Sequence, residues 1–155
     1  MNVILLKQQH HAIMTAIQEL VDLVDRPSAE SLPHIANARL KLARAVSVNM
    51  ASETAEIHEP LQRHKMTSRI PAYAGIADRT RELRLVFSAH ISKWSTSAIQ
   101  DDWQGYGRSL KSITADLAEI LAHEERDLFP HAQTLLVSIS DTAWSGGLRP
   151  QPAGG

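Results

Sequence analysis

The stretch Ile120-Leu-Ala-His-Glu-Glu-Arg-Asp-Leu-Phe-Pro130 ends the last long helix that the sequence predicts. Apolar residues lead up to it at steps of three or four positions, the spacing that places side chains on one face of an α-helix. Glu124 falls on this apolar face. Because an unpaired carboxylate is costly to bury, Glu124 needs a cation, a metal ion or hydrogen-bond donors beside it, or must keep its proton. The face consists of Tyr106, Leu110, Ile113, Leu117, Ile120, Glu124 and Leu128.

Three earlier segments show the same periodicity and predict three more helices. Each carries polar residues on its otherwise apolar face, so several polar side chains are expected inside the protein. The segments and their inward residues of interest are 3–24 with His10, 33–59 with Glu53 and either Asn49 or Met50, and 76–99 with Thr80 and His90.

Four helices with single apolar stripes favour an all-α fold, an antiparallel four-helix bundle with up-down-up-down order. We expect residues 1–140 to form this bundle and residues 141–155 a C-terminal tail rich in glycine and proline. Residues 60–75 are predicted to be a long irregular connection. The fourth helix is expected to begin with a cap from Asp101 or Asp102 and to end at Pro130, where His131 caps its last turn.

Composition narrows the classes of function. The 155 residues carry a net charge of −1, 43% hydrophobic residues and no cysteine, so one domain with a real core is expected, without disulfides or thiolate chemistry. This charge favours neither a nucleic acid nor a membrane surface as partner. No stretch approaches the length of a membrane span, which predicts a cytoplasmic protein.

The segment Glu124-Glu-Arg-Asp-Leu-Phe-Pro130 resembles the end of a hemerythrin-like (HHE cation-binding) domain. The fourth helix of that family typically reads His-x-x-x-Glu-Glu-x-x-Leu-Phe-Pro. The resemblance implies a four-helix bundle that binds metal with one histidine from each of the first and third helices, and a His-x-x-x-Glu pair from each of the second and fourth. Carried over to this chain, those positions are His10, Thr80, Asn49 with Glu53, and Ile120 with Glu124.

The resemblance therefore implies that both acids and one histidine of four are kept. The third-helix position is open between two residues. Thr80 and His90 share a stripe, but ten residues of helix separate them by about 15 Å, so only one can be level with Glu124. Thr80 is the expected partner if the fourth helix begins near Asp102, and His90 packs on aromatic neighbours in that case.

Three interpretations of the inward cluster remain open. A metal-free network would pair a protonated His10 with Glu53 or Glu124, with the Asn49 amide and the Thr80 hydroxyl as donors. A single iron or zinc ion on His10, Glu53 and Glu124 is chemically reasonable, and a di-iron centre would need the lost imidazoles.

These interpretations predict two kinds of protein. One is a hemerythrin-like protein with a degenerate cation site, metal-free or weakly metal-binding, that acts as an interaction or binding protein, with a homodimer as one arrangement. The alternative is a non-heme iron protein that binds or senses oxygen, nitric oxide or peroxide. An enzyme that uses Glu124 as an acid or base would require an open pocket beside it.

Overall fold

The protein is all-helical in its computed structural model, which describes residues 1–145. Its long helices are α1 (Val3–Val24), α2 (Leu32–Glu53), α4 (Tyr73–Lys93) and α6 (Trp103–His123). Shorter helices are α3 (Glu59–Arg63), α5 (Thr96–Asp101) and α7 (Phe129–Ser145). The all-α expectation is confirmed. Most of the expected tail, residues 146–155, lies outside the described residues.

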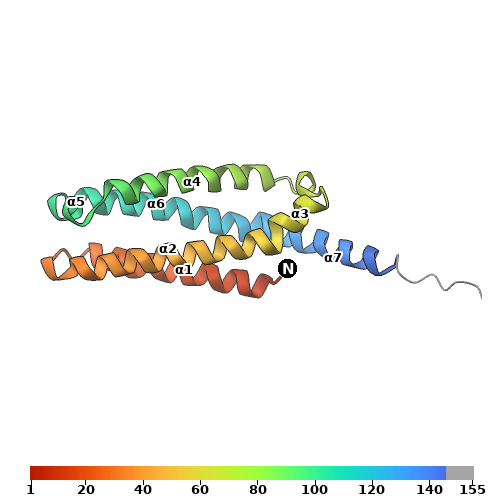
Figure 1. The fold of residues 1–155 in the computed structure, drawn as a ribbon, viewed down its shortest axis with the longest axis horizontal. Coiled ribbons are helices and arrows are strands. Elements are labelled where there is room, and N and C mark those ends of the chain that lie inside the picture. The colour runs from red at the N-terminus through yellow and green to blue at the C-terminus, as the bar shows by residue number, and fades with distance from the viewer. Residues whose placement is uncertain (146–155) are drawn as a thin grey trace, which may run out of the picture.

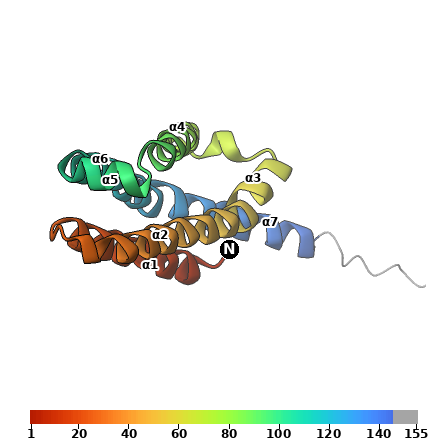
Figure 2. The ribbon, with the colours of Figure 1, turned by 60° about the vertical axis from the view of Figure 1, so that its left-hand side comes forward.

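The long helices run side by side as rods, with α7 continuing beyond one end of them (Figure 1). Helix α1 packs against both α2 and α6, while α4 packs mainly on α6. Figure 2 shows the pair α1 and α2 on one side of the molecule and α4 on the other. Helix α4 therefore has its main packing partner in α6 and leaves its side toward α2 less covered.

Local sequence explains where several helices begin. The Asn2 side chain caps α1 by accepting a hydrogen bond from the Leu5 N–H at 3.0 Å. Asp102 caps α6 in the same way, accepting from the Gly105 N–H at 2.8 Å, so the predicted aspartate cap is confirmed. Such caps satisfy amide groups that have no partner in the first helical turn.

The predicted helix 76–99 is wrong in its boundaries. Helix α4 begins earlier, at Tyr73, and ends at Lys93, and a short α5 follows. The break lies at Trp94, and Ser95 then caps α5 by accepting from the Ala98 N–H. A serine cap starts a new helix here because it offers the backbone an alternative to continuing the old one. The predicted irregular connection 60–75 is partly wrong too, since α3 reaches Arg63 and α4 already includes Tyr73.

The fourth predicted helix was expected to end at Pro130, but the chain remains helical beyond it. A π-helical segment, Glu124–Leu128, follows α6, and α7 then continues to Ser145. A second π-helical segment, Thr54–His58, joins α2 to α3. In both places a proline lies two residues beyond the π-helical segment, at Pro60 and Pro130. The wider turn accommodates a residue that has no N–H and whose ring crowds the preceding carbonyl. His131 therefore lies inside a continuing helix, where its Nδ1 is 3.1 Å from the Asp127 carbonyl oxygen.

Two apolar clusters form the core, with polar residues between them. One contains Ile13, Leu42 and Leu121, and the other contains Leu6, Ile57 and Leu128. Within α1, at the end of α2 and directly after α6, the chain passes from one cluster to the other through a buried polar residue. These residues are His10, Glu53 and Glu124, which we call the polar layer.

None of the helices within residues 1–145 combines the length and the apolar character that a membrane span needs.

Candidate metal centre

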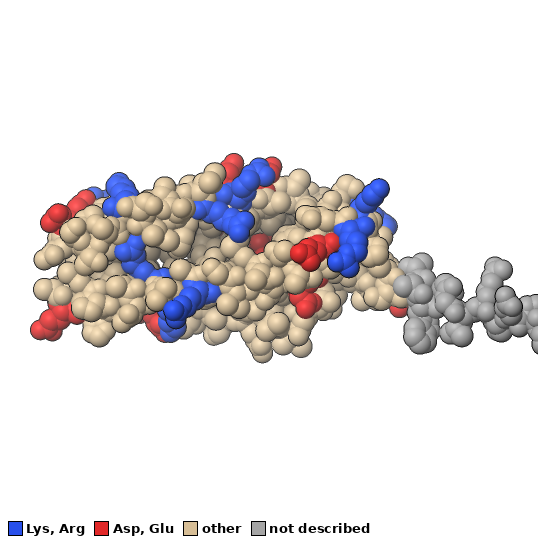
Figure 3. Space-filling model, in the orientation of Figure 1, with Lys and Arg blue, Asp and Glu red and all other residues tan. Residues whose placement is uncertain are grey.

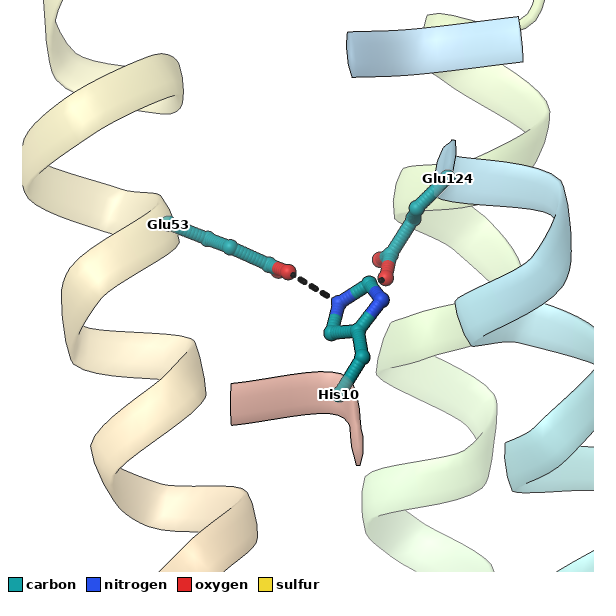
Figure 4. A group of neighbouring side chains, drawn as sticks. All are labelled: His10, Glu53 and Glu124. Atoms are coloured by element: carbon teal, nitrogen blue, oxygen red, sulfur yellow. Dashed lines mark hydrogen bonds and ion pairs between the residues drawn. The ribbon is translucent and has the colours of Figure 1, made fainter. Parts of the chain in front are cut away.

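The polar layer brings together three residues that the sequence placed on separate helices. His10, Glu53 and Glu124 are 2%, 4% and 3% exposed, and each offers one ligand atom within 4.8 Å of the other two. Figure 4 shows the two carboxylates approaching the imidazole from different sides, Glu53 from the end of α2 and Glu124 from the start of the π-helical segment that follows α6. His10 Nε2 lies 3.1 Å from Glu53 Oε1 and 3.6 Å from Glu124 Oε2. The predicted convergence of His10, Glu53 and Glu124 is thus present in the fold.

The imidazole of His10 is held on both of its nitrogens. Its Nδ1 lies 2.9 Å from Oε1 of Glu125, a residue that sequence reasoning did not assign to the site. Its ring also packs on Phe129, with the ring centres 5.2 Å apart. A carboxylate that accepts from Nδ1–H fixes the tautomer and leaves Nε2 to meet a proton or a cation.

Glu53 has a second partner on its own helix. The Asn49 amide donates to Glu53 Oε1 at 3.1 Å. The predicted role of Asn49 as a hydrogen-bond donor is therefore confirmed. Thr80 does not share this role, because among the described residues it donates to neither acid. It is half-buried and lines the same cavity as Glu53 and Glu124.

Glu124 is the least satisfied member of the layer. Its Oε2 is buried and, within the described chain, accepts no hydrogen bond. Burial raises the pKa of this carboxyl to about 9, and the negative charges of Glu53 and Glu125 add to the shift. Without a cation, the folded protein therefore keeps a proton on Glu124 near neutral pH. A positive ion beside the two acids would lower the pKa of Glu124 and favour loss of this proton.

A cavity of about 360 Å³ borders the layer on the side between α2 and α4. Glu53, Glu124, Asn49, Thr80 and Ile120 all line it, together with apolar walls such as Leu83 and Phe87. The face in Figure 3 is hollowed between these two rods, and an acidic side chain is visible inside the hollow. Small molecules therefore have a route toward the acids, although the carboxylates themselves are almost fully covered.

The choice between Thr80 and His90 is decided by the same cavity. Thr80 lines it beside Glu124, whereas His90 does not. His90 instead stacks on Tyr106 at 5.6 Å and lies near Trp94 and Phe87, as expected for the case in which α6 begins near Asp102. The buried Ile120 fills the place at which the family resemblance expects a histidine.

The spacing of the three donors suits one small cation. Two donors on a tetrahedral ion with bonds of about 2.1 Å lie about 3.4 Å apart. The distances from His10 Nε2 to the two acids bracket this value, at 3.1 and 3.6 Å. The unpartnered Glu124 oxygen and the orienting Glu125 add to the fit. A second ion does not fit as well, because Thr80 and Ile120 bring no imidazole. Comparison with models of protein families, with curated proteins and with solved structures gives no match to this chain.

Proposed function

We propose that this chain is a hemerythrin-like four-helix bundle whose cation site is degenerate and binds one ion weakly. His10 Nε2, Glu53 Oε1 and Glu124 Oε2 would hold the ion, and Glu125 would orient the imidazole. Two carboxylates and one imidazole suit Fe²⁺ or Zn²⁺. A bound ion would supply a positive charge that neutralises the two acids.

One observation carries the proposal. Glu124 Oε2 lies 3.6 Å from His10 Nε2, is buried, and accepts no hydrogen bond from the described residues. Buried polar atoms in folded proteins nearly always have a partner. A protonated Glu124 leaves this oxygen unsatisfied, whereas a cation would satisfy it together with Glu53. This unpartnered oxygen, placed beside a second acid and an imidazole, therefore supports a cation site.

Weak binding follows from the chain's own groups. Three ligands are fewer than the four of a closed structural zinc site. The proton on Glu124 must leave before a metal ion can bind, which makes the affinity depend on pH. Asn49 also competes for Glu53 Oε1, since its amide already donates to that atom. We therefore expect the affinity to be lower than that of a structural zinc site.

Isothermal titration calorimetry tests the proposal with Zn²⁺, and anaerobically with Fe²⁺, on protein freed of metal by a chelator. We expect one ion per chain, and a loss of affinity of about tenfold or more in Glu124→Gln, equal to about 1.4 kcal/mol. The matched control is Glu119→Gln, an exposed acid on α6 that pairs with Arg79. Absence of binding, or equal affinity of the Glu124 variant and the wild type, would contradict the proposal.

The cavity favours a second candidate function, the binding or sensing of oxygen, nitric oxide or peroxide at an iron-loaded site. Its apolar walls and its position against both acids would let a small uncharged molecule reach the iron. The test is the optical spectrum of the Fe²⁺-loaded protein before and after addition of nitric oxide. A spectrum that does not change would remove this candidate while leaving simple cation binding intact.

A further inference from the structure

A second cavity of about 510 Å³ lies between α2 and α4, toward the end where α5 connects to α6. It shares Ala43, Phe87 and Ile91 with the cavity beside the acids, yet its chemistry differs. Its polar lining comes mainly from Arg39, His90, Trp94 and Tyr106, and all its lining residues lie within the described chain. None of them is an aspartate or a glutamate.

Three of the lining residues each carry a buried polar atom that has no hydrogen-bond partner in the described structure. The atoms are His90 Nε2, Trp94 Nε1 and the Tyr106 hydroxyl, on side chains that are 8%, 5% and 0% exposed at the residue level. Their rings form one cluster, with His90 stacked on Tyr106 at 5.6 Å and Trp94 edge-on to Tyr106 at 5.5 Å. Since buried polar atoms without a partner are rare, three in one cluster favour a polar ligand at this place.

The charge at this cavity is positive. The Arg39 guanidinium lies 5.8 Å from the centre of the Tyr106 ring, and among the described residues it forms no ion pair. Elsewhere on the surface, Arg79 and Lys111 each have a carboxylate partner. A half-buried guanidinium without one is suited to an external anion.

The walls limit the size and shape of that anion. Apart from the polar cluster they are apolar, including Leu20, Leu42 and Leu110, and the volume lies within the range of small-molecule sites. A flat apolar body would fit among these apolar walls. A single negative charge matches Arg39, whereas a phosphate dianion would lack further cations within the cavity.

We propose that the cavity bounded by Arg39, Trp94 and Tyr106 binds a small organic carboxylate with a flat apolar body. The carboxylate accepts hydrogen bonds from the Arg39 guanidinium and the Trp94 indole N–H, and the body lies among the apolar walls. Because Trp94 Nε1 is covered, side chains around it must shift for the carboxylate to reach it. This site is separate from the polar layer and does not depend on the proposed cation.

The test uses benzoate as the probe and the indole N–H signals of ¹⁵N-labelled protein as the readout. Trp94 Nε1 has no partner, whereas Trp103 Nε1 already donates to the Val24 carbonyl oxygen at 2.7 Å and serves as an internal control. Benzoate should shift the Trp94 signal to a hydrogen-bonded position in a saturable manner and leave the Trp103 signal in place. The variant Trp94→Phe, which keeps an aromatic ring, assigns the signal.

Two variants and three further probes separate the alternatives. Arg39→Met should weaken benzoate binding about tenfold or more, while Arg44→Met, an exposed arginine on the same helix, should leave it unchanged. Benzylamine, benzyl alcohol and inorganic phosphate should not produce the shift at the same concentration. The proposal is overturned if the Trp94 signal does not respond, if Arg39→Met binds like the wild type, or if a neutral, cationic or phosphate probe binds as well as benzoate.

Discussion

Nδ1 of His10 lies 2.9 Å from Oε1 of Glu125. The imidazole of the polar layer is therefore oriented by a third carboxylate, in addition to the two buried acids Glu53 and Glu124. The Glu125 side chain is 36% exposed and reaches the ring from the edge of the layer. This contact makes Nε2 the atom that faces Glu53 and Glu124. A carboxylate on one ring nitrogen is common where the other nitrogen of a histidine binds a metal ion.

Replacing Glu125 by glutamine should weaken cation binding without removing it. The amide cannot stabilise the imidazole as the carboxylate does, and changes of this kind lower metal affinity by about 10- to 100-fold. Calorimetry with Zn²⁺ on Glu125→Gln gives the measurement, and the melting temperature without metal shows whether the fold is intact. If Zn²⁺ affinity stays at the wild-type value in the folded variant, Glu125 does not orient the ligand.

Stability without metal should fall as the pH rises between about 4.5 and about 9. The folded pKa of Glu124 is raised from its ordinary value of 4.5 to about 9, so in this range the folded state holds a proton that the unfolded state has released. Stability decreases with pH wherever the folded state binds more protons. The contribution is complete below the unfolded pKa and is lost as the pH rises through the folded pKa, with a slope of up to about 1.4 kcal/mol per pH unit.

Urea unfolding at pH 6, 7 and 8 in the presence of a chelator measures this slope. Glu124→Gln removes the titrating group while keeping a similar shape, so its stability should depend less steeply on pH. Equal slopes for the wild type and the variant would show that Glu124 is ionised in the folded protein.

Adding imidazoles at the positions that lack them should raise the number of ions bound. Asn49, Thr80 and Ile120 line the cavity beside the acids, so Asn49→His, Thr80→His and Ile120→His together would add three ligands there. We expect two Fe²⁺ or Zn²⁺ ions per chain by calorimetric titration, against one in the wild type. Ser88→His, which lines the same cavity, is a control. A folded triple variant that still binds one ion would contradict the hemerythrin-like alignment.

Phe129 should be among the most costly side chains to truncate. It is 1% exposed, belongs to the second apolar cluster and packs on the His10 ring. Phe129→Ala should lower the free energy of unfolding by about 3–5 kcal/mol. Val137→Ala, at a side chain that is 55% exposed, should change it by less than about 0.5 kcal/mol. Urea unfolding compares them, and similar losses in the two variants would refute the assignment of Phe129 to the core.

Helical periodicity was sufficient to place the three central residues of the site. His10, Glu53 and Glu124 each recur at the spacing of their helix's apolar face, and all three are buried. The same argument could not find Glu125, because a neighbour in sequence points about 100° away around a helix. Its contact depends on where α1 passes the end of α6, which is a property of the packing. A signal was nevertheless present, since two consecutive acids offer one inward and one flanking carboxylate.

The predicted helix boundaries were wrong for reasons that lie in the local sequence. Pro130 was expected to end its helix, but a π-helical segment lets the chain pass through it, and periodicity at 3.6 residues per turn contains no sign of this. The break at Trp94 was missed because Trp94 and Ala98 still match the apolar stripe. The Ser95 cap was the available signal. The sequence contains no pattern that predicts the three unpartnered polar atoms of His90, Trp94 and Tyr106, because the lack of a hydrogen-bond partner depends on the three-dimensional packing.

The polar layer also fixes the register in which the long helices pack against one another. A displacement of α6 by one turn, about 5.4 Å along its axis, would move Glu124 from His10 and Glu53 into an apolar cluster. An entirely apolar helix interface tolerates such a shift in register, since one leucine contact replaces another at little cost in free energy. A Glu124→Leu variant would therefore gain apolar contact and lose its fixed alignment, and the expected result is a compact helical protein with broadened spectra and several coexisting packings.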